Sequence, residues 1–282
     1  MSGPDVAGFY DRATRGFLAL GHGGKQGIIH RAVWGPGVTT RARALRFAED
    51  QIAARCPERA RLLDMGCGVG SSLAYLADAV PHATGVGVTL SEAQVQHAAA
   101  LLAERRLDDR LACRRGDFTD IDHPSDQFDV AYAIEAFVHG PDPDAFFAEA
   151  ARLLAPGGRL MVVDDMLSDR GANAQGRDAA LLDRFIEGWH IQTLITRDAM
   201  VAAAGRAGFQ LTSTRDWTRW VELRRPRDRA ITLGVALTRH LPIRHPWWAS
   251  MRGGDALQHA LLAGLLQYRF TVFDLDAART GP

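Results

Sequence analysis

The chain has 282 residues, of which 47% are hydrophobic and 23% charged, as is typical of a globular protein with a substantial core. Its 33 lysines and arginines balance 33 acidic residues, so no net charge attracts nucleic acid or an anionic membrane, and a small or neutral partner is expected. Three scattered cysteines form neither a disulfide framework nor a zinc motif, and no apolar run reaches the roughly 18 residues of a membrane span. The first residues lack the basic and apolar regions of a secretion signal. We therefore expect a cytoplasmic protein with no integral membrane segment, and a homodimer is compatible with the sequence.

Residues 1–55 are predicted to form a helical lid in front of the main domain. Glycine-rich breaks occur at 21–27 and 35–37, and residues 39–55 have the apolar spacing of one amphipathic helix. Aromatic and basic side chains are interspersed here, which suits a lid over a site, although each could equally pack a helical collar onto a sheet. The candidates for contact with a substrate are His30, Arg31 and Trp34.

The stretch 62–70 predicts a buried strand that runs into a nucleotide-binding turn. Apolar residues end at Asp64, glycines follow at alternate positions, and Ser71 and Ser72 open a helical pattern. Glycines let the backbone approach a ligand, and a helix start offers amide groups to it. A turn without a ligand is the alternative, but the order of the surrounding elements favours a ligand.

Strands and helices alternate after this turn, so we expect an α/β fold with a Rossmann-like, doubly wound sheet. Further strands are predicted over 83–88, 111–114, 127–134 and 159–163, with helices over 91–106 and 142–154. Ligands bind beyond the carboxyl ends of such strands, so the loops there should meet in one crevice. We assign residues 56–170 to the cofactor-binding core of a single compact domain.

Residues 171–282 are predicted to combine cap insertions with the last strands of the sheet. Helices are expected over 181–189, 197–206 and 256–266, and strands over 209–214 and 268–275. The segments 171–196 and 218–255 are interpreted as insertions that cover the ligand edge. Within residues 171–282, the candidates for a substrate wall, which could equally be core residues, are Trp189, His190, Trp217 and Trp220.

The glycine spacing discriminates between cofactors. A dinucleotide site would need Gly-x-Gly-x-x-Gly and an acid after the second strand, whereas the chain has Gly66-x-Gly68-x-Gly70 and Thr89. Asp64 suits a positively charged ligand, and S-adenosylmethionine carries a sulfonium and an ammonium beside a carboxylate for the loop amides. S-adenosylmethionine is therefore the predicted cofactor.

Asp64-x-Gly66-x-Gly68-x-Gly70 resembles the first motif of the class I methyltransferases, and later segments follow that family's order across most of the chain. Segment 87–94 is similar to the second-strand motif of sterol and cyclopropane fatty-acid methyltransferases, in which threonine and glutamine replace the ribose acid. Segment 132–141 resembles their Ile-Glu-Ala-x-x-His sequence, and residues 264–268 resemble the end of tocopherol C-methyltransferases. The cofactor-binding residues that this resemblance implies are Asp64, Gly66, Cys67, Gly68, Gly70, Thr89, Leu90, Gln94, Asp117, Phe118 and Ile134.

The resemblance also implies a mostly parallel sheet with an antiparallel last strand. The expected acceptor is small and mostly apolar, often an isoprenoid that is methylated on carbon. Near the N-terminus, Leu18, Ala19 and Leu20 stand where sterol methyltransferases have aromatic residues, which argues against a sterol as first choice. Acceptor regions vary freely on one fold, so the acceptor inferred in this way is an analogy.

Three residues are candidates for the chemical step. Methylation of an alkene would create a carbocation, which a carboxylate and aromatic faces can stabilise before a base takes a proton. Glu135, at the end of the fourth strand, is the leading base or cation stabiliser, with a structural role in holding the cofactor or a loop as the alternative. His139 is a second candidate for proton transfer or a helix-start residue, and Tyr10 would lie over the sulfonium or pack a helix.

Carbon methylation of an isoprenoid-type alkene, including a prenyl diphosphate or a sterol-like compound, is the first functional hypothesis. The second is O- or N-methylation of a phenolic or amine natural product, with His139 or His190 as base and Glu135 as its orienter. The third is a non-catalytic cofactor-binding protein. No metal is expected unless the acceptor is a diphosphate; Asp164 and Asp165 would then hold Mg²⁺. In that case Arg224, Arg225 and Arg227, with His30 and Arg31, would grip the phosphates, although a solvated, turn-forming surface is the more usual role of such an arginine segment.

Overall fold

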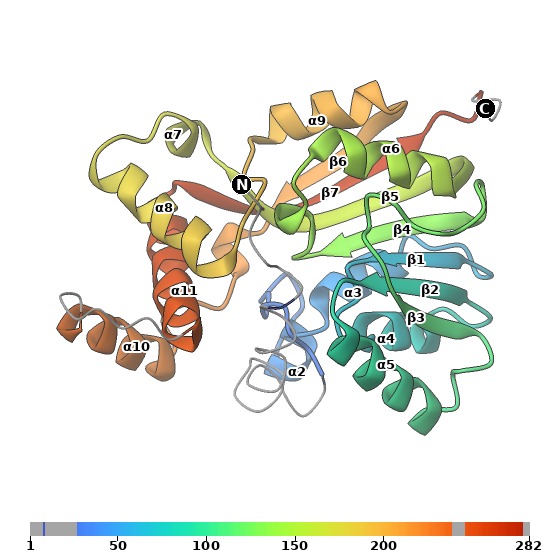
Figure 1. Cartoon of the computed structure of the whole chain (residues 1–282), viewed down its shortest axis with the longest axis horizontal. Coiled ribbons are helices and arrows are strands. Elements are labelled where there is room, and N and C mark those ends of the chain that lie inside the picture. The colour runs from blue at the N-terminus through green and yellow to red at the C-terminus, as the bar shows by residue number, and fades with distance from the viewer. Residues whose placement is uncertain (1–7, 9–26, 239–245, 279–282) are drawn as a thin grey trace.

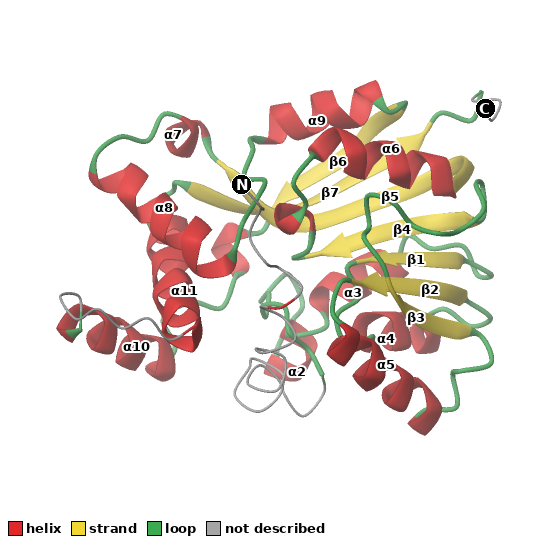
Figure 2. Ribbon diagram, in the orientation of Figure 1, coloured by secondary structure: helices red, strands yellow, loops and turns green. Residues whose placement is uncertain are grey.

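The computed structural model describes Gly8, residues 27–238 and residues 246–278. A seven-stranded sheet forms its centre, with strand order β3-β2-β1-β4-β5-β7-β6 (Figure 2). The strands are β1 (Arg61–Met65), β2 (Thr84–Thr89), β3 (Leu111–Arg115), β4 (Phe128–Ile134), β5 (Leu154–Leu167), β6 (Phe209–Asp216) and β7 (Leu266–Leu275). The first five run parallel, whereas β7 pairs antiparallel with both β5 and β6. The predicted α/β class and antiparallel last strand are confirmed.

Helices cover both faces of the sheet, and a separate group lies beyond one end of it (Figure 1). The flanking helices are α3 (Phe47–Ala53), α4 (Ser71–Ala79), α5 (Glu92–Glu104), α6 (Pro143–Leu153) and α9 (Arg197–Arg206). The separate group consists of α8 (Arg177–Trp189), α10 (Pro226–Leu237) and α11 (Pro246–Leu262). Shorter helical segments are α2 (Arg41–Ala44), α7 (Asp169–Ala172), η2 (Phe137–His139) and η3 (Thr218–Trp220).

The middle of the sheet is buried because β4 is almost entirely apolar and β1 is apolar except for Arg61 and Asp64. Leu62, Leu63 and Met65 of β1 are fully buried, as are Ala131 and Tyr132 of β4. Parallel strands covered on both faces are continuously apolar in this way, rather than alternating. This rigid centre holds the carboxyl ends of β1 and β4 side by side.

Three element boundaries differ from the sequence prediction. The single helix expected over 39–55 is two helices, α2 and α3, because Arg46 leaves helical geometry at φ −109° and ψ 4° and turns its guanidinium toward Ser71. The fifth strand extends well beyond residues 159–163, because β7 pairs with it from Arg159 through to Leu167. The last helix begins at Pro246, not residue 256, so part of the segment interpreted as an insertion belongs to α11.

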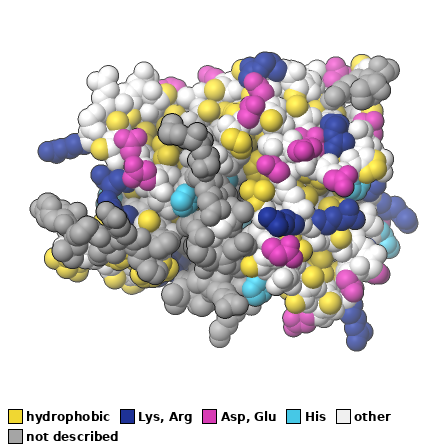
Figure 3. Space-filling view, in the orientation of Figure 1, with side chains coloured by type: hydrophobic (Ala, Val, Ile, Leu, Met, Phe, Trp, Pro, Cys, Tyr) yellow, Lys and Arg dark blue, Asp and Glu magenta, His cyan; other side chains and the backbone are white. Residues whose placement is uncertain are grey.

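The surface shows no large region of one charge on the face seen in Figure 3, where acidic and basic side chains are interspersed. This agrees with the balanced charge of the sequence. Among the described residues, no helix is both long and apolar enough to cross a bilayer.

Helices α8 and α11 approach each other so closely that only glycine fits at their crossing. A Cβ on Gly188 would lie 2.5 Å from the Cα of Gly253 and 2.7 Å from the carbonyl oxygen of Ala249. These neighbours are backbone atoms, so a larger residue must push the helices apart.

Gly188→Ala is therefore expected to destabilise the protein by about 1–3 kcal/mol, the usual cost of overpacking. Gly205→Ala is the matched control, because Gly205 lies in α9 and a Cβ there would meet nothing within 4 Å. The control should be neutral or stabilising, since alanine is the better helix former. Thermal unfolding followed by circular dichroism measures both, and an equal melting temperature for the two variants would contradict the close crossing.

Candidate active site

A cavity of about 650 Å³ lies beyond the carboxyl ends of the parallel strands. It extends from the glycine loop after β1 to helices α8, α10 and α11, and residues from the loops after β1, β2, β3 and β4 meet in it. Of the residues predicted to bind the cofactor, those that line it are Asp64, Gly66, Cys67, Gly68, Thr89, Leu90, Gln94, Phe118 and Ile134. The structure thus brings most of the predicted cofactor site together.

The glycine loop has a backbone that favours glycine at each motif position. Gly66, Gly68 and Gly70 have φ angles of 116°, 52° and 75°, which lie in the left-handed region. A Cβ on Gly66 would also meet the Cβ of Ala136 at 2.3 Å. Gly70 lies outside the cavity lining but starts α4, and no side chain caps that helix start. The first amide groups of α4 therefore suit a ligand carboxylate.

Asp64 is a buried carboxyl group at the end of β1. It is 2% exposed, and its Oδ2 accepts a hydrogen bond of 2.9 Å from the hydroxyl of Tyr132. Burial raises the pKa of Asp64 to about 7; the Tyr132 hydrogen bond lowers it, while the nearby charge of Glu49 raises it and that of His30 lowers it. A cationic ligand would supply the positive charge that this carboxylate lacks, so the residues fit the ammonium and sulfonium of S-adenosylmethionine.

The second-strand motif forms its own hydrogen-bonded unit in the cavity wall. The hydroxyl of Thr89 donates to Oε1 of Gln94 at 2.6 Å, and the backbone N–H of Ser91 donates to Thr89 at 3.3 Å. Asp117 differs from the expectation of direct contact, because it is exposed and outside the lining. Its carboxylate accepts bonds from the backbone and hydroxyl of Thr119, while the next residue, Phe118, lines the cavity.

Glu135 lies where the cofactor half of the cavity meets the cap helices. Its Oε1 accepts hydrogen bonds from the backbone N–H and the Nε of Arg31 at 3.0 and 2.9 Å, and from the hydroxyl of Tyr268 at 2.8 Å. Its φ of 51° is unusual for a glutamate and is fixed by the bond from its N–H to Val163. Burial alone would raise the pKa of Glu135, but the charges of Arg31 and His30 lower it. Glu135 is therefore an ionised carboxylate.

The two histidines proposed for proton transfer differ in position. His139 lines the cavity, and burial lowers its pKa to about 4, so its imidazole is neutral and weakly basic. His190 is the left-handed C-cap of α8 and lies outside the lining.

His30 and Arg31 line the cavity, and their charged groups pair with protein carboxylates, so their contact with an acceptor stays a prediction. His30 Nε2 lies 2.9 Å from Glu49 Oε1. Arg31 donates to both carboxylate oxygens of Asp165 at 3.0 and 2.8 Å, in addition to Glu135.

The same contacts bear on the conditional metal site. Asp165 is occupied by Arg31, and Asp164 accepts hydrogen bonds from the backbone N–H groups of Val138 and Asp165. No group of three or more potential metal ligands occurs in the described part of the chain. In this structure the Asp164–Asp165 pair holds the loop at Val138 and the guanidinium of Arg31.

The tryptophans divide between wall and core. Trp189 lines the cavity. Trp217 does not, because it is 1% exposed and stacks on Phe270 with ring centroids 4.9 Å apart. Trp220 packs against Phe47 outside the lining, and Trp34 is 37% exposed and donates to Glu222. These three correct the predicted acceptor wall, and Tyr10 lies outside the described residues.

Sequence reasoning did not single out much of the apolar wall. Phe185 of α8 lines the cavity beside the predicted Trp189, together with Met251, Leu257 and Leu261 of α11. Phe185 and Trp189 are four residues apart, and Met251, Leu257 and Leu261 are spaced by six and four residues, which places each set on one side of its helix. The sequence prediction missed the α11 residues in part because it placed the start of that helix ten residues too late. Ile28 and Ile29 also line the cavity, in a segment with no periodic pattern.

The comparisons with known proteins agree with this arrangement. Residues 39–214, more than half of the chain, match the family model described as a methyltransferase domain. The chain is 31% identical to the 27-O-demethylrifamycin SV methyltransferase of Amycolatopsis mediterranei over 67% of this chain and 68% of that protein. It is 32% identical to a sterol 24-C-methyltransferase of Neurospora crassa over 55% of this chain but only 41% of that enzyme, so it spans less than half the length of this relative.

The fold has close neighbours among solved structures. The geranyl diphosphate C-methyltransferase of Streptomyces coelicolor A3(2), solved with Mg²⁺, a substrate analogue and S-adenosylhomocysteine, superposes with a TM-score of 0.71. The match covers 96% of both chains at 18% identity, which establishes a shared fold.

We expect S-adenosylmethionine to bind with release of a proton near pH 7, because a bound cation favours the ionised form of Asp64, whose pKa is about 7. Affinity should rise between pH 6 and pH 7 as this carboxyl group ionises. Isothermal titration calorimetry at pH 7 in two buffers of different ionisation enthalpy measures the proton release.

Asp64→Asn should weaken binding by about 1.5–3 kcal/mol, the worth of a hydrogen bond to a charged group, and should lose this proton release. Asp50→Asn is the control, because Asp50 accepts a bond from Tyr75 away from the cavity. Binding of full strength by folded Asp64→Asn would contradict the assignment.

Proposed function

This chain belongs to the methyltransferase-domain family of class I, S-adenosylmethionine-dependent enzymes, and on that premise we propose that it methylates a carbon atom of a small, apolar, isoprenoid-type acceptor. The observation that carries the proposal is the ionised carboxylate of Glu135 at the boundary between the cofactor half and an apolar chamber. Within this proposal, residues 1–55 form a lid, residues 56–170 the cofactor core and residues 171–282 a cap.

The chamber suits a reaction that must exclude water. Its wall on α8 and α11 consists mainly of apolar and aromatic side chains, including Phe185, Trp189 and Met251. Water would capture a carbocation, whereas aromatic faces attract a cation without reacting with it. The wall therefore supports carbon methylation of an alkene more than methylation of a polar group.

Glu135 has a suitable position and charge for the second half of such a reaction. S-adenosylmethionine supplies an electrophilic methyl group when bound. As the acceptor double bond forms a bond to that methyl, the sulfur–methyl bond would break and neutral S-adenosylhomocysteine would leave, so that the positive charge passes to the neighbouring acceptor carbon. Oε1 of Glu135 is fixed by Arg31 and Tyr268. Oε2 accepts no hydrogen bond from the described residues, and in this proposal it takes the proton from the carbon adjacent to the cation, which restores a double bond. A carboxylate of low pKa suffices, because a carbocation loses a proton even to a weak base.

The relatives support the same proposal, with an uncharged acceptor preferred. A sterol 24-C-methyltransferase is among the relatives, and a geranyl diphosphate C-methyltransferase shares the fold. In this chain Arg31 is neutralised by Asp165 and Glu135, and Arg225 by Asp228 at 2.9 Å. These ion pairs favour an acceptor without a diphosphate.

A second candidate function is O-methylation of a natural product. One support is the rifamycin methyltransferase, because the chain covers more of that relative than of the sterol methyltransferase. The other is the neutral imidazole of His139 in the cavity. A pKa of about 4 makes His139 a weak base for a hydroxyl proton, so carbon methylation remains the preferred proposal.

Trideuteromethyl-labelled S-adenosylmethionine, offered with a panel of prenyl alcohols, prenyl diphosphates and phenolic natural products, is expected to place its label on carbon. Carbon-13 and deuterium NMR of the product distinguish the C–CD₃ group from an O–CD₃ group. Products labelled only on oxygen would replace this proposal with the second one.

Glu135→Gln should lower turnover roughly 100-fold, the usual contribution of a positioned proton acceptor, while affinity for S-adenosylhomocysteine changes little. Glu135→Asp keeps the charge and should recover part of the rate. Glu187→Gln, at an exposed position of α8, serves as control. Unchanged turnover in Glu135→Gln would show that the carboxylate takes no part in the reaction.

A further inference from the structure

Residues 27–31 form a wall of the cofactor half of the cavity, although they lie far from the glycine loop in sequence. All five line the cavity. Gly27 is close to the loop, since a Cβ there would lie 3.3 Å from Cγ2 of Val69, and a Cβ on Gly68 would lie 3.6 Å from Cδ1 of Ile29. The position of this segment therefore shapes the cofactor site directly.

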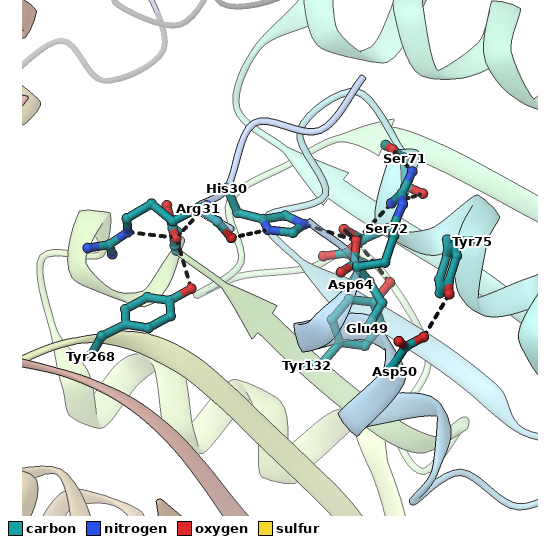
Figure 4. A network of polar contacts seen from close by, with 12 residues as sticks. His30, Arg31, Glu49, Asp50, Asp64, Ser71, Ser72, Tyr75, Tyr132 and Tyr268 are labelled. Carbon is teal, nitrogen blue, oxygen red and sulfur yellow. Dashed lines mark hydrogen bonds and ion pairs between the residues drawn. The ribbon is translucent and has the colours of Figure 1, made fainter. Parts of the chain in front are cut away.

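One buried glutamate, Glu49 of α3, connects this segment to the start of α4 (Figure 4). Its Oε1 accepts hydrogen bonds from Nε2 of His30 at 2.9 Å, from Nη1 of Arg46 at 2.8 Å and from the hydroxyl of Ser72 at 3.1 Å. Arg46 continues to the hydroxyl of Ser71 at 2.9 Å. Three separate parts of the chain thus meet at one oxygen atom.

The electrostatics make His30 and Glu49 an ion pair. Burial disfavours both charges, yet their mutual attraction raises the pKa of His30 and lowers that of Glu49 to about 2. Glu49 is 0% exposed, and its Oε2 has no hydrogen-bond partner among the described residues. Removing one partner of such a pair leaves the other charge buried and uncompensated, which is strongly unfavourable. His30 therefore cannot leave Glu49 without a large cost.

We propose that Glu49 is a positioning residue for the methyl donor: through His30 it fixes segment 27–31 against the glycine loop, and through Ser72 and Arg46 it fixes the start of α4. Glu49 does not itself line the cavity, so it acts through these partners. His30 is thereby assigned to the donor side of the site rather than to the acceptor. The inference rests on the assignment of the cofactor half to S-adenosylmethionine, and not on the identity of the acceptor.

Glu49→Gln should raise the dissociation constant of S-adenosylhomocysteine about ten-fold, because an amide cannot balance the charges of His30 and Arg46. His30→Gln should weaken binding to a similar extent, and the double variant should be no weaker than the poorer single variant, since both remove the same link. Isothermal titration calorimetry with S-adenosylhomocysteine measures all three without any acceptor, so failure of the proposed carbon methylation would not affect the result.

Asp50→Asn is the matched control, because Asp50 neighbours Glu49 on α3 and also accepts a hydrogen bond from α4, at 2.7 Å from Tyr75, but has no contact with segment 27–31 (Figure 4). It should keep wild-type affinity. Hydrogen–deuterium exchange should become faster at residues 28–31 in Glu49→Gln and His30→Gln but not in the control.

A lower melting temperature of Glu49→Gln with affinity within two-fold of wild type would show that Glu49 is merely structural and would overturn the proposal. Additive effects of the two substitutions would overturn it as well. If Glu49→Gln does not fold, the test rests on His30→Gln alone. Wild-type affinity of His30→Gln would refute the proposal, whereas a ten-fold loss of affinity with faster exchange at residues 28–31 would support it.

Discussion

The guanidinium of Arg31 is the interaction on which the organisation of the site depends. It lies between the carboxylates of Asp165 and Glu135 and over the ring of Tyr268, with 4.2 Å from its Cζ to the ring centroid. Asp165 lies near the end of β5, Glu135 directly follows β4, and Tyr268 lies near the start of β7. These three strands are neighbours in the sheet. One buried cation therefore allows two carboxylates to stay close together in the core, and it attaches the N-terminal segment to the edge of the sheet.

This charge compensation separates two environments within one cavity. On the cofactor side, Asp64 forms no ion pair with any described residue and has a raised pKa, so it is suited to a ligand that brings positive charge. On the cap side, α8 and α11 cross closely at Gly188 and Gly253, and their side chains form a mainly apolar wall. Glu135 stands between them, ionised because Arg31 and His30 lie beside it. The proposed reaction needs this combination of an ionised carboxylate and a mainly apolar chamber.

The sequence predicted the cofactor half well because its signals are local. The positive φ angles of Gly66, Gly68 and Gly70 require particular residues at fixed spacing, and alternating strands and helices bring the following loops to one edge. The prediction failed for side chains whose role depends on distant partners. Trp217 and Trp220 are aromatic residues of the kind that line ligand cavities, yet Trp217 is buried against Phe47 and Phe270, and the partly buried Trp220 packs on Phe47; both phenylalanines are remote in sequence. Likewise, nothing near His30 and Arg31 in sequence indicates that Glu49 and Asp165 neutralise them.

By itself, therefore, the sequence determined the fold class, the family and the cofactor, because periodicity and the backbone geometry of the glycine loop depend on short stretches of chain. The tertiary structure alone decided which charges are paired and which aromatic residues line the cavity. Ion pairing and burial depend on contacts such as Arg31 with Asp165, 134 residues apart, and no local pattern records them. For the same reason, the hydrogen bond between Glu49 of α3 and His30, on which its proposed positioning role rests, could be seen only in the tertiary structure.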